Sequence, residues 1–147
     1  MLIEFDDTYF MKEALKQANE AFQKDEVPVG AVVVADKTII ARAHNMTETL
    51  QDVTAHAEML AITAAANHLG SKYLQDCVLY VTLEPCSMCA CASGWAQIGK
   101  IVWGASDPKK GFTTVSKKML HPKTNLIKGV MEKEASELLK EFFKKRR

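Results

Sequence analysis

Three short segments of this chain carry residue types that can close on one metal ion, and this requirement constrains the fold more than any other feature. The segments are His56-Ala57-Glu58, Pro85-Cys86 and Cys89, which together read H-x-E…P-C-x-x-C. A zinc site with three protein ligands keeps a fourth position open for water. We therefore predict that His56, Cys86 and Cys89 bind Zn²⁺, so the fold must bring distant parts of the chain to one point.

Length and composition limit what surrounds this site. The 147 residues, of which 48% are hydrophobic and 25% charged, suit one domain with one core, so we expect residues 1–147 to form a single domain. A net charge of +1 means that any nucleic-acid contact must come from local basic patches. We see no secretory signal and no membrane-length apolar run, so we expect a cytoplasmic protein whose cysteines bind metal rather than form a disulfide-linked partner.

The pattern of apolar residues predicts alternating helices and strands. We expect helices over residues 8–24, 54–70, 85–96 and 131–145, and strands over residues 29–34, 38–43, 77–83, 100–104 and 126–130. Asp7 is the expected N-cap of the first helix, Pro85 suits the first turn of the third, and residues 105–126 are irregular and basic. This order implies an α/β protein with three layers, α/β/α, in which helices cover both faces of a five-stranded mixed sheet. We expect that sheet to be mostly parallel and to open with an antiparallel hairpin.

The positions of the cysteines favour an open metal site. Cys86 and Cys89 are three residues apart at the start of a predicted helix, so their thiols share a face and lie near its positive end. We expect His56 in the first turn of its own helix. Cys91 leaves the shared face, and Cys77, inside an apolar strand, reads as a small core residue. A closed structural zinc site, with a fourth cysteine as ligand, is the alternative.

Glu58 fits the role of a proton carrier. Two thiolates and a neutral imidazole cancel the charge of Zn²⁺, so an auxiliary base is needed to activate water at neutral pH. Because Glu58 is only two residues from His56, a regular helix would aim the two side chains in different directions, which argues against Glu58 as a fourth ligand. The motif is typical of enzymes that replace an exocyclic amino group by oxygen and release ammonia.

The motif and its flanking segments resemble the cytidine deaminase-like superfamily and, more narrowly, the bacterial tRNA adenosine deaminases. The resemblance covers nearly the whole chain and is carried by residues 27–32, His44-Asn45, 54–58, 79–90, 98–105 and Phe142-Phe143. It implies the cytidine deaminase-like fold, one Zn²⁺ per subunit and a homodimer. It also implies deamination of the wobble adenosine of a tRNA anticodon loop to inosine.

The resemblance also assigns substrate contacts. Asn45 would hydrogen-bond the target nucleoside, Val29 would pack on its base, and Asp107 would contact a neighbouring nucleotide. The terminal helix around Phe142 and Phe143, with the basic residues 144–147, would hold flanking RNA. Each has a simpler reading, in which Asn45 and Asp107 are turn residues, Val29 is core, and the basic tail is a solvated helix end.

Two other functions remain open. Three segments depart from the tRNA enzymes in regions that choose the substrate: Lys110-Gly111-Phe112, Asn125-Leu126 and residues 93–97, where Trp95-Ala96 resembles bacterial guanine deaminases. A free nucleobase or nucleoside deaminase, acting on guanine or cytosine/cytidine, is therefore an alternative. A non-catalytic RNA-binding module with structural zinc is a third, although such a module has no use for Glu58. Trp95 and Trp103 suit either a subunit interface or the core.

Overall fold

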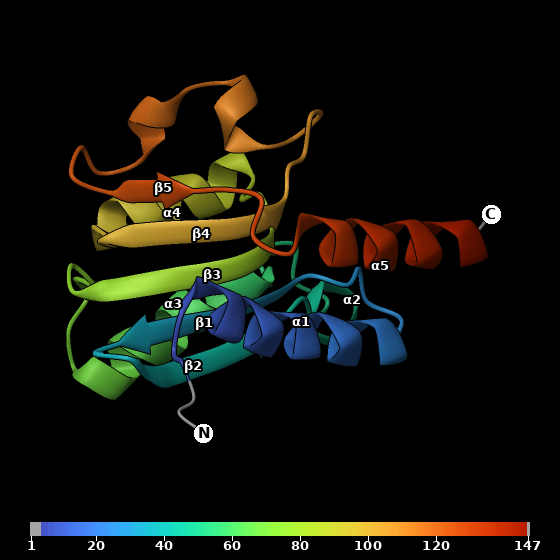
Figure 1. Ribbon diagram of the computed structural model, residues 1–147, viewed down its shortest axis with the longest axis horizontal. Helices are drawn as coiled ribbons and strands as arrows, with labels where there is room; N and C mark the ends of the chain where they lie inside the picture. Colours follow the sequence, from blue (N-terminus) through green and yellow to red (C-terminus); the bar gives the residue numbers. More distant parts are fainter. Residues whose placement is uncertain (1–3, 147) are drawn as a thin grey trace.

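The computed structural model describes residues 4–146, so Met1, Leu2, Ile3 and Arg147 lie outside the description. Its elements surround a five-stranded sheet of order β2-β1-β3-β4-β5 (Figure 1). In chain order they are α1 (Asp7–Gln23), β1 (Gly30–Ala35), β2 (Thr38–His44), α2 (Thr47–Leu50), α3 (Ala57–Leu69), β3 (Cys77–Leu83), α4 (Ser87–Ala96), β4 (Lys100–Ala105), the 3₁₀ turns η1 (Phe112–Thr114) and η2 (Lys117–Met119), β5 (Asn125–Ile127) and α5 (Glu132–Lys145). Among the helices of residues 4–146, none has the length and apolar character needed to cross a bilayer.

The sheet is mixed, as predicted, but it is not mostly parallel. β1 runs antiparallel to both β2 and β3, whereas β3, β4 and β5 run parallel to one another. The expected hairpin joins β1 to β2 through Asp36 and Lys37, whose positive φ angles suit a tight hairpin turn. Because β1 lies between β2 and β3, two of the four strand pairings in the sheet, β1 with β2 and β1 with β3, are antiparallel.

Alternation along the strands produces the predicted three layers. Val32 and Tyr80 belong to the core beneath α1, while their neighbours Val33 and Val81 belong to the core beneath α3 and α4. Successive side chains of a strand point to opposite faces, so β1 and β3 each supply both cores. α1 and α5 cover the near face of the sheet in Figure 1, and α3 and α4 cover the far face.

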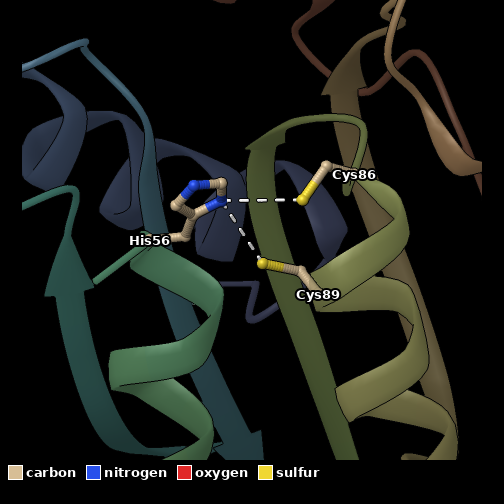
Figure 2. Close-up of side chains that lie close together, drawn as sticks. All are labelled: His56, Cys86 and Cys89. Carbon is tan, nitrogen blue, oxygen red and sulfur yellow. Dashed lines mark hydrogen bonds between the residues drawn. The ribbon is translucent and has the colours of Figure 1, made fainter. Parts of the chain in front are cut away.

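The helices α3 and α4 begin later than predicted, so His56 and Pro85 lie before the first turn and not within it. His56 and Cys86 are N-cap residues with extended backbone, and the helices begin at Ala57 and Ser87. Pro85 therefore precedes its helix rather than starting it. The reason is long-range pairing: the Pro85 carbonyl accepts a hydrogen bond from the Phe112 N–H at 2.9 Å, which keeps this segment extended. The amino ends of both helices meet beyond the carboxyl end of β3 (Figure 2).

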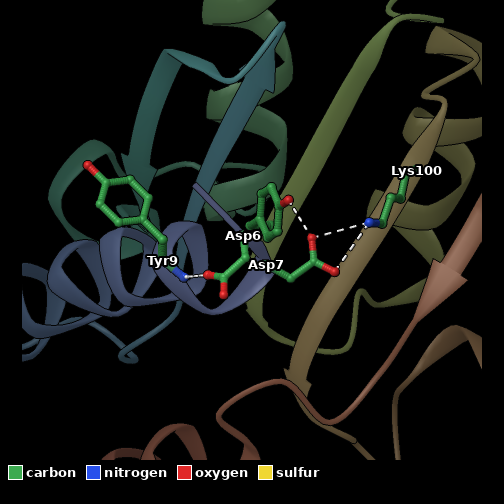
Figure 3. Close-up of polar contacts among 5 residues, drawn as sticks. Asp6, Asp7, Tyr9 and Lys100 are labelled. Carbon is green, nitrogen blue, oxygen red and sulfur yellow. Dashed lines mark hydrogen bonds and ion pairs between the residues drawn. The ribbon is translucent and has the colours of Figure 1, made fainter. Parts of the chain in front are cut away.

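The start of α1 also differs from the prediction. Asp6 is the N-cap, and its carboxylate accepts a hydrogen bond from the Tyr9 N–H at 2.8 Å. Asp7 begins the helix and instead accepts hydrogen bonds from the Tyr80 hydroxyl at 2.7 Å and from the Lys100 ammonium at 3.2 Å (Figure 3). These contacts attach the start of α1 to β3 and to the amino end of β4.

The last strand is shorter than predicted, and the polar stretch after β2 contains a helix that the sequence did not predict. β5 ends at Ile127 because the chain then turns through Gly129 and Met131, both with positive φ. The short helix α2 forms within residues 45–53, for which we predicted neither a helix nor a strand. Residues 105–126 are largely irregular, as predicted, apart from η1 and η2.

Candidate metal centre and active site

The three predicted zinc ligands lie together at the amino ends of α3 and α4 (Figure 2). His56 Nδ1 is 3.6 Å from Cys86 Sγ and 3.6 Å from Cys89 Sγ, and the three ligand atoms lie within 4.8 Å of one another. Tetrahedral zinc, with bonds of about 2.0 Å to nitrogen and about 2.3 Å to sulfur, separates such atoms by about 3.5 Å. The donor set and its spacing therefore fit a zinc ion.

Hydrogen bonds within the cluster shift the pKa values of its three side chains. The hydrogen bond from Cys89 lowers the pKa of the Cys86 thiol to about 4, and a further hydrogen bond to His56 acts in the same direction. The same contact with Cys86 raises the pKa of Cys89, and burial adds to this rise. Hydrogen bonding to Cys86 also raises the pKa of His56. A divalent cation that binds here displaces these shared protons, since metal ligands must be deprotonated.

Glu58 is the buried acid of the site. It is the second residue of α3, and only 4% of it is exposed. Burial raises the pKa of its carboxyl to about 7. A carboxyl group that exchanges its proton near neutral pH, beside a site that can activate water, is suited to general acid/base catalysis.

A cavity of about 490 Å³ opens next to the ligand cluster. Its lining includes His56, Cys86 and Glu58 together with four of the predicted substrate-contacting residues: Val29, Asn45, Asp107 and Phe143. The volume is in the range of small-molecule sites. The structure thus gathers residues from the start of β1, the ends of β2 and β4 and the start of α3 around one concave site.

The predicted substrate residues are held in place by backbone contacts. The Asn45 side-chain amide donates a hydrogen bond to the Val27 carbonyl at 3.4 Å. The Asp107 carboxylate accepts hydrogen bonds from the N–H groups of Lys109 and Lys110 at 3.1 and 3.0 Å, so Asp107 does form the turn that its simpler reading predicts. Both residues nevertheless line the cavity, so the turn and site readings are compatible.

The two phenylalanines of α5 lie in different environments. Phe143 lines the cavity and is 47% exposed, whereas Phe142 is buried against Phe22 at a centroid distance of 6.0 Å. Phe142 therefore anchors α5, and its burial argues against direct contact with RNA. In the basic tail, Arg146 pairs with Asp25 at 2.5 Å and lies over the Phe142 ring. The predicted contribution of Arg147 lies outside the described residues.

The two remaining cysteines and the two tryptophans each divide into one buried and one exposed residue. Cys77 is buried in the core and Cys91 is exposed on α4, so neither adds a fourth ligand to the cluster of residues 56, 86 and 89. The closed zinc site is therefore not supported. Trp103 is buried against Phe112, which agrees with its core reading, whereas Trp95 is 84% exposed.

Two buried carboxylates beside the cavity were not predicted. Glu26 is fully buried and accepts hydrogen bonds from the Glu48 and Thr49 N–H groups at the start of α2. Glu84 is 4% exposed and accepts hydrogen bonds from the Asp107 and Thr113 N–H groups. Glu84 directly precedes Pro85 and Glu26 lies two residues before Pro28, each at the border of an apolar segment, and this is a weak signal that could have drawn attention to them.

Comparison with known proteins identifies the family. MafB19-like deaminases match residues 5–147. The tRNA-specific adenosine deaminase of Aquifex aeolicus is 49% identical over 144 residues, which cover 95% of each chain. The tRNA-specific adenosine deaminase of Bacillus subtilis is 44% identical over 96% of this chain and 91% of its own length.

Solved structures give the same relationship. A structure from studies of A-to-I editing by tRNA:A34 deaminases superposes with a TM-score of 0.84 and 43% identity, over 90% of this chain and 99% of that one. The guanine deaminase of Bacillus subtilis superposes with a TM-score of 0.66 and 40% identity, but over only 69% of this chain and 65% of that one. The metal-ligand cluster, the buried acid beside it and the match along the whole chain agree, and the chain belongs to the MafB19-like deaminase family and to the family of tRNA-specific adenosine deaminases.

Proposed function

We propose that this protein hydrolyses the exocyclic amino group of the wobble adenosine in a tRNA anticodon loop, giving inosine and ammonia. The observation that carries the proposal is the His56, Cys86 and Cys89 cluster with a buried Glu58 at one end of an open cavity. The relatives that match along 95% of the chain are tRNA-specific adenosine deaminases, and this supports the choice of substrate.

Metal binding and proton transfer fall to different side chains of the site. We propose that His56 Nδ1 and the thiolates of Cys86 and Cys89 hold one Zn²⁺ per subunit, in a single domain spanning residues 1–147 that acts in the cytoplasm. A zinc ion at such a centre supplies Lewis-acid activation of a water molecule. The Glu58 carboxylate would take one proton from the water whose oxygen bonds to C6 and deliver it to the ring nitrogen beside C6. It would then move the second proton of that oxygen, from the new C6–OH group, to the amino group, which leaves as ammonia when the C6–N bond breaks.

The cavity suits a base that has left its stack. A flipped nucleoside must be hydrogen-bonded and packed in its pocket. Asn45 offers a polar side chain and Val29 an apolar one, both from the cavity wall. At the mouth, exposed Phe143 can stack on a flanking base, and Lys110 can contact a phosphate.

The test compares three substrates with the zinc-loaded protein. We expect inosine at the wobble position of a transcript carrying A34, read as guanosine after reverse transcription, and no inosine in a transcript carrying G34. Guanine and cytidine are assayed in parallel for ammonia release. Unchanged RNA together with rapid ammonia release from guanine would overturn the assignment.

Free-base deamination is the second candidate, because the guanine deaminase of Bacillus subtilis is 40% identical over the aligned part of the chain. The metal-ligand motif of this chain does not distinguish the two substrates, because both reactions would replace an exocyclic amino group by oxygen. The structure from studies of tRNA:A34 deaminases superposes over more of this chain, 90% against 69%, and with a higher TM-score, 0.84 against 0.66, and this favours RNA.

We also propose that the protein is a homodimer in which the surface around Trp95 contacts the second copy. Trp95 is 84% exposed on α4 and lines an apolar hollow of about 350 Å³ with Met119 and Pro122. Large exposed apolar patches mark interaction sites. We expect Trp95→Glu to shift the protein from dimer to monomer in sedimentation equilibrium.

The matched control is Val53→Glu, which introduces the same charge at an apolar residue that is 85% exposed elsewhere on the surface. It should leave the mass of the assembly unchanged. A dimer that persists in Trp95→Glu would show that the interface lies elsewhere.

A further inference from the structure

The carboxylate of Glu84 lies between two cavities and holds the wall that separates them. Glu84 and Asp107 line both the 490 Å³ cavity with the metal-ligand cluster and a neighbouring cavity of about 360 Å³. Glu84 Oε1 accepts a hydrogen bond from the Asp107 N–H at 3.1 Å. Its Oε2 accepts hydrogen bonds from the Thr113 N–H at 3.1 Å and the Thr113 hydroxyl at 2.7 Å. Three donors from one loop therefore converge on one buried side chain.

The same loop is also attached to the metal-ligand segment through its backbone. The Glu84 N–H donates to the Ala105 carbonyl at 2.8 Å, and Cys86 forms an isolated antiparallel bridge with Gly111. Residues 84–86 and 105–113 thus form one unit. These contacts fix Cys86, a metal ligand, and Asp107 relative to each other.

Gly111 shows how closely the two segments approach. A Cβ added at Gly111 would collide with the Glu84 carboxylate and with the Asp107 carbonyl oxygen, although the backbone of Gly111 (φ −63°) suits any residue. Glycine is therefore required here for space rather than for backbone freedom. This gives a second way to displace the same carboxylate without removing its charge.

The orientation of the substrate wall depends on these contacts. The Asp107 carboxylate is used within its own turn, on the N–H groups of Lys109 and Lys110, so this turn moves with the Asp107 backbone. The Asp107 N–H is the group that Glu84 holds. A shift at Glu84 therefore moves Asp107 and Lys110 together.

We propose that Glu84 is a positioning residue for RNA recognition: it fixes the Asp107–Lys110 turn relative to Cys86 and thereby sets the affinity for the RNA that flanks the target base. The proposal rests on the proposed function, because it assumes an RNA substrate. A carboxylate is needed, since both of its oxygens receive backbone N–H donors. The amide of a glutamine would present an N–H group to one of them.

The test is steady-state kinetics with an anticodon stem-loop RNA. We expect Glu84→Gln to raise KM about 10-fold or more while kcat stays within about threefold, because loss of positioning away from the reacting atoms removes binding that ground and transition states share. Metal content should equal that of the wild type. Gly111→Ala should also raise KM, and the double variant should be no worse than the poorer single variant, because both changes disturb the same contact between Glu84 and the Asp107 backbone.

Amide exchange gives a readout that does not need RNA. In Glu84→Gln the Asp107 and Thr113 N–H groups should exchange faster than in the wild type, while Glu4→Gln, which removes an exposed carboxylate, should change neither exchange nor KM. Should Glu84→Gln fail to fold, Thr113→Val removes only the hydroxyl contact and should raise KM by a smaller factor.

The outcomes separate the two proposals. A wild-type protein that leaves RNA unchanged refutes the proposed function, and the exchange data still show whether Glu84 holds the loop. An unchanged KM in both Glu84→Gln and Gly111→Ala overturns the positioning role. A parallel loss of metal and kcat would instead make Glu84 a structural support of Cys86.

Discussion

A change of backbone conformation between His56 and Glu58 separates metal binding from proton transfer. His56 is an N-cap with extended backbone (φ −72°, ψ 153°), whereas Glu58 lies within the first turn of α3. The imidazole therefore turns to the thiols of α4, and the carboxyl group stays buried in the cavity wall. Inside a regular helix, residues two apart face different directions, so the N-cap is what allows both side chains to serve one site.

Replacement of Glu58 by glutamine tests its role as the proton carrier. We expect Glu58→Gln to lower kcat about 100-fold or more, because an amide cannot shuttle the proton, with zinc content and melting temperature like the wild type. Turnover on A34 RNA and metal analysis of the same sample check this. Wild-type turnover in the variant would leave the mechanism without its acid and base.

The cysteines offer a matched pair of substitutions. Cys86→Ala should abolish tight zinc binding, because two ligands remain, and should lower the melting temperature, since bound metal stabilises the fold. Cys91→Ala, an exposed neighbour on the same helix, should keep both properties. Equal zinc content in the two variants would contradict the assigned ligand set.

Local patterns revealed the residues that do chemistry but not those that hold them. His56, Cys86 and Cys89 could be predicted because their types and spacing define a ligand set. Glu26 and Glu84 could not, because their partners are N–H groups of distant loops, which no local pattern encodes. For Phe142 the helical period predicted its place on α5. It did not predict whether the ring packs into the core or faces RNA.

At the level of elements, the short helix α2 depends on Glu26. The carboxylate of Glu26 accepts hydrogen bonds from the Glu48 N–H at 3.1 Å, the Thr49 N–H at 2.6 Å and the Thr49 hydroxyl at 2.6 Å. A helix of four residues cannot sustain itself in water. Glu26 therefore maintains the segment that follows Asn45 and contributes Thr47 to the cavity.

These contacts make the contribution of Glu26 to stability depend on pH. Burial acts to raise the pKa of Glu26, but the hydrogen bonds from Thr49 and Glu48 outweigh it and leave this pKa below its ordinary value of 4.5. A pKa that is lower in the folded state stabilises the fold above the unfolded pKa, and this stabilisation is lost as pH falls through the folded pKa. We expect Glu26→Gln to lower the free energy of unfolding at pH 7 by about 1–3 kcal/mol.

The gap between wild type and Glu26→Gln should narrow as the pH falls below 4.5. Urea unfolding of both proteins at several pH values measures it, with Glu137→Gln, an exposed glutamate, as control. A gap that is constant with pH would show that the charge of Glu26 is not involved.

Element types were predictable, whereas element ends were not. The β1–β2 hairpin and the buried strand β3 followed from alternation and apolar runs. The start of α4 did not, because the extended backbone at Pro85 and Cys86 is imposed by Phe112 and Gly111. The antiparallel pairing of β1 with β3 likewise reflects the order of strands in space, to which a local pattern is blind.

At the scale of the whole molecule, the near-neutral charge concentrates any RNA binding on the cavity side. The net charge is +1, so attraction to phosphates must come from local groups of basic residues, and Lys110 is a lysine in the cavity lining. Counterion release makes such binding depend on salt, with a slope of about 0.7 for each phosphate contact with a single strand. A neutral free base would bind with almost no salt dependence.

The dependence on salt also isolates the contribution of Lys110. We expect Lys110→Ala to weaken RNA binding and to reduce the slope of log K against log salt by about 0.7. Lys37→Ala, in the hairpin turn at the other end of β1, should leave the slope unchanged. Fluorescence anisotropy with a labelled stem-loop between about 50 and 200 mM salt measures both. Equal slopes in the two variants would place the phosphate contacts elsewhere.

The attachment of Asp7 to Tyr80 and Lys100 has a practical consequence for handling this protein. It fixes the start of α1 at the amino end of β4, whereas the cavity opens beyond the carboxyl end of that strand. Phe143, near the finish of α5, is itself part of the cavity lining. An affinity tag or fluorophore belongs ahead of Glu4, since the same cargo joined behind Arg146 would crowd the entrance that a large ligand has to use.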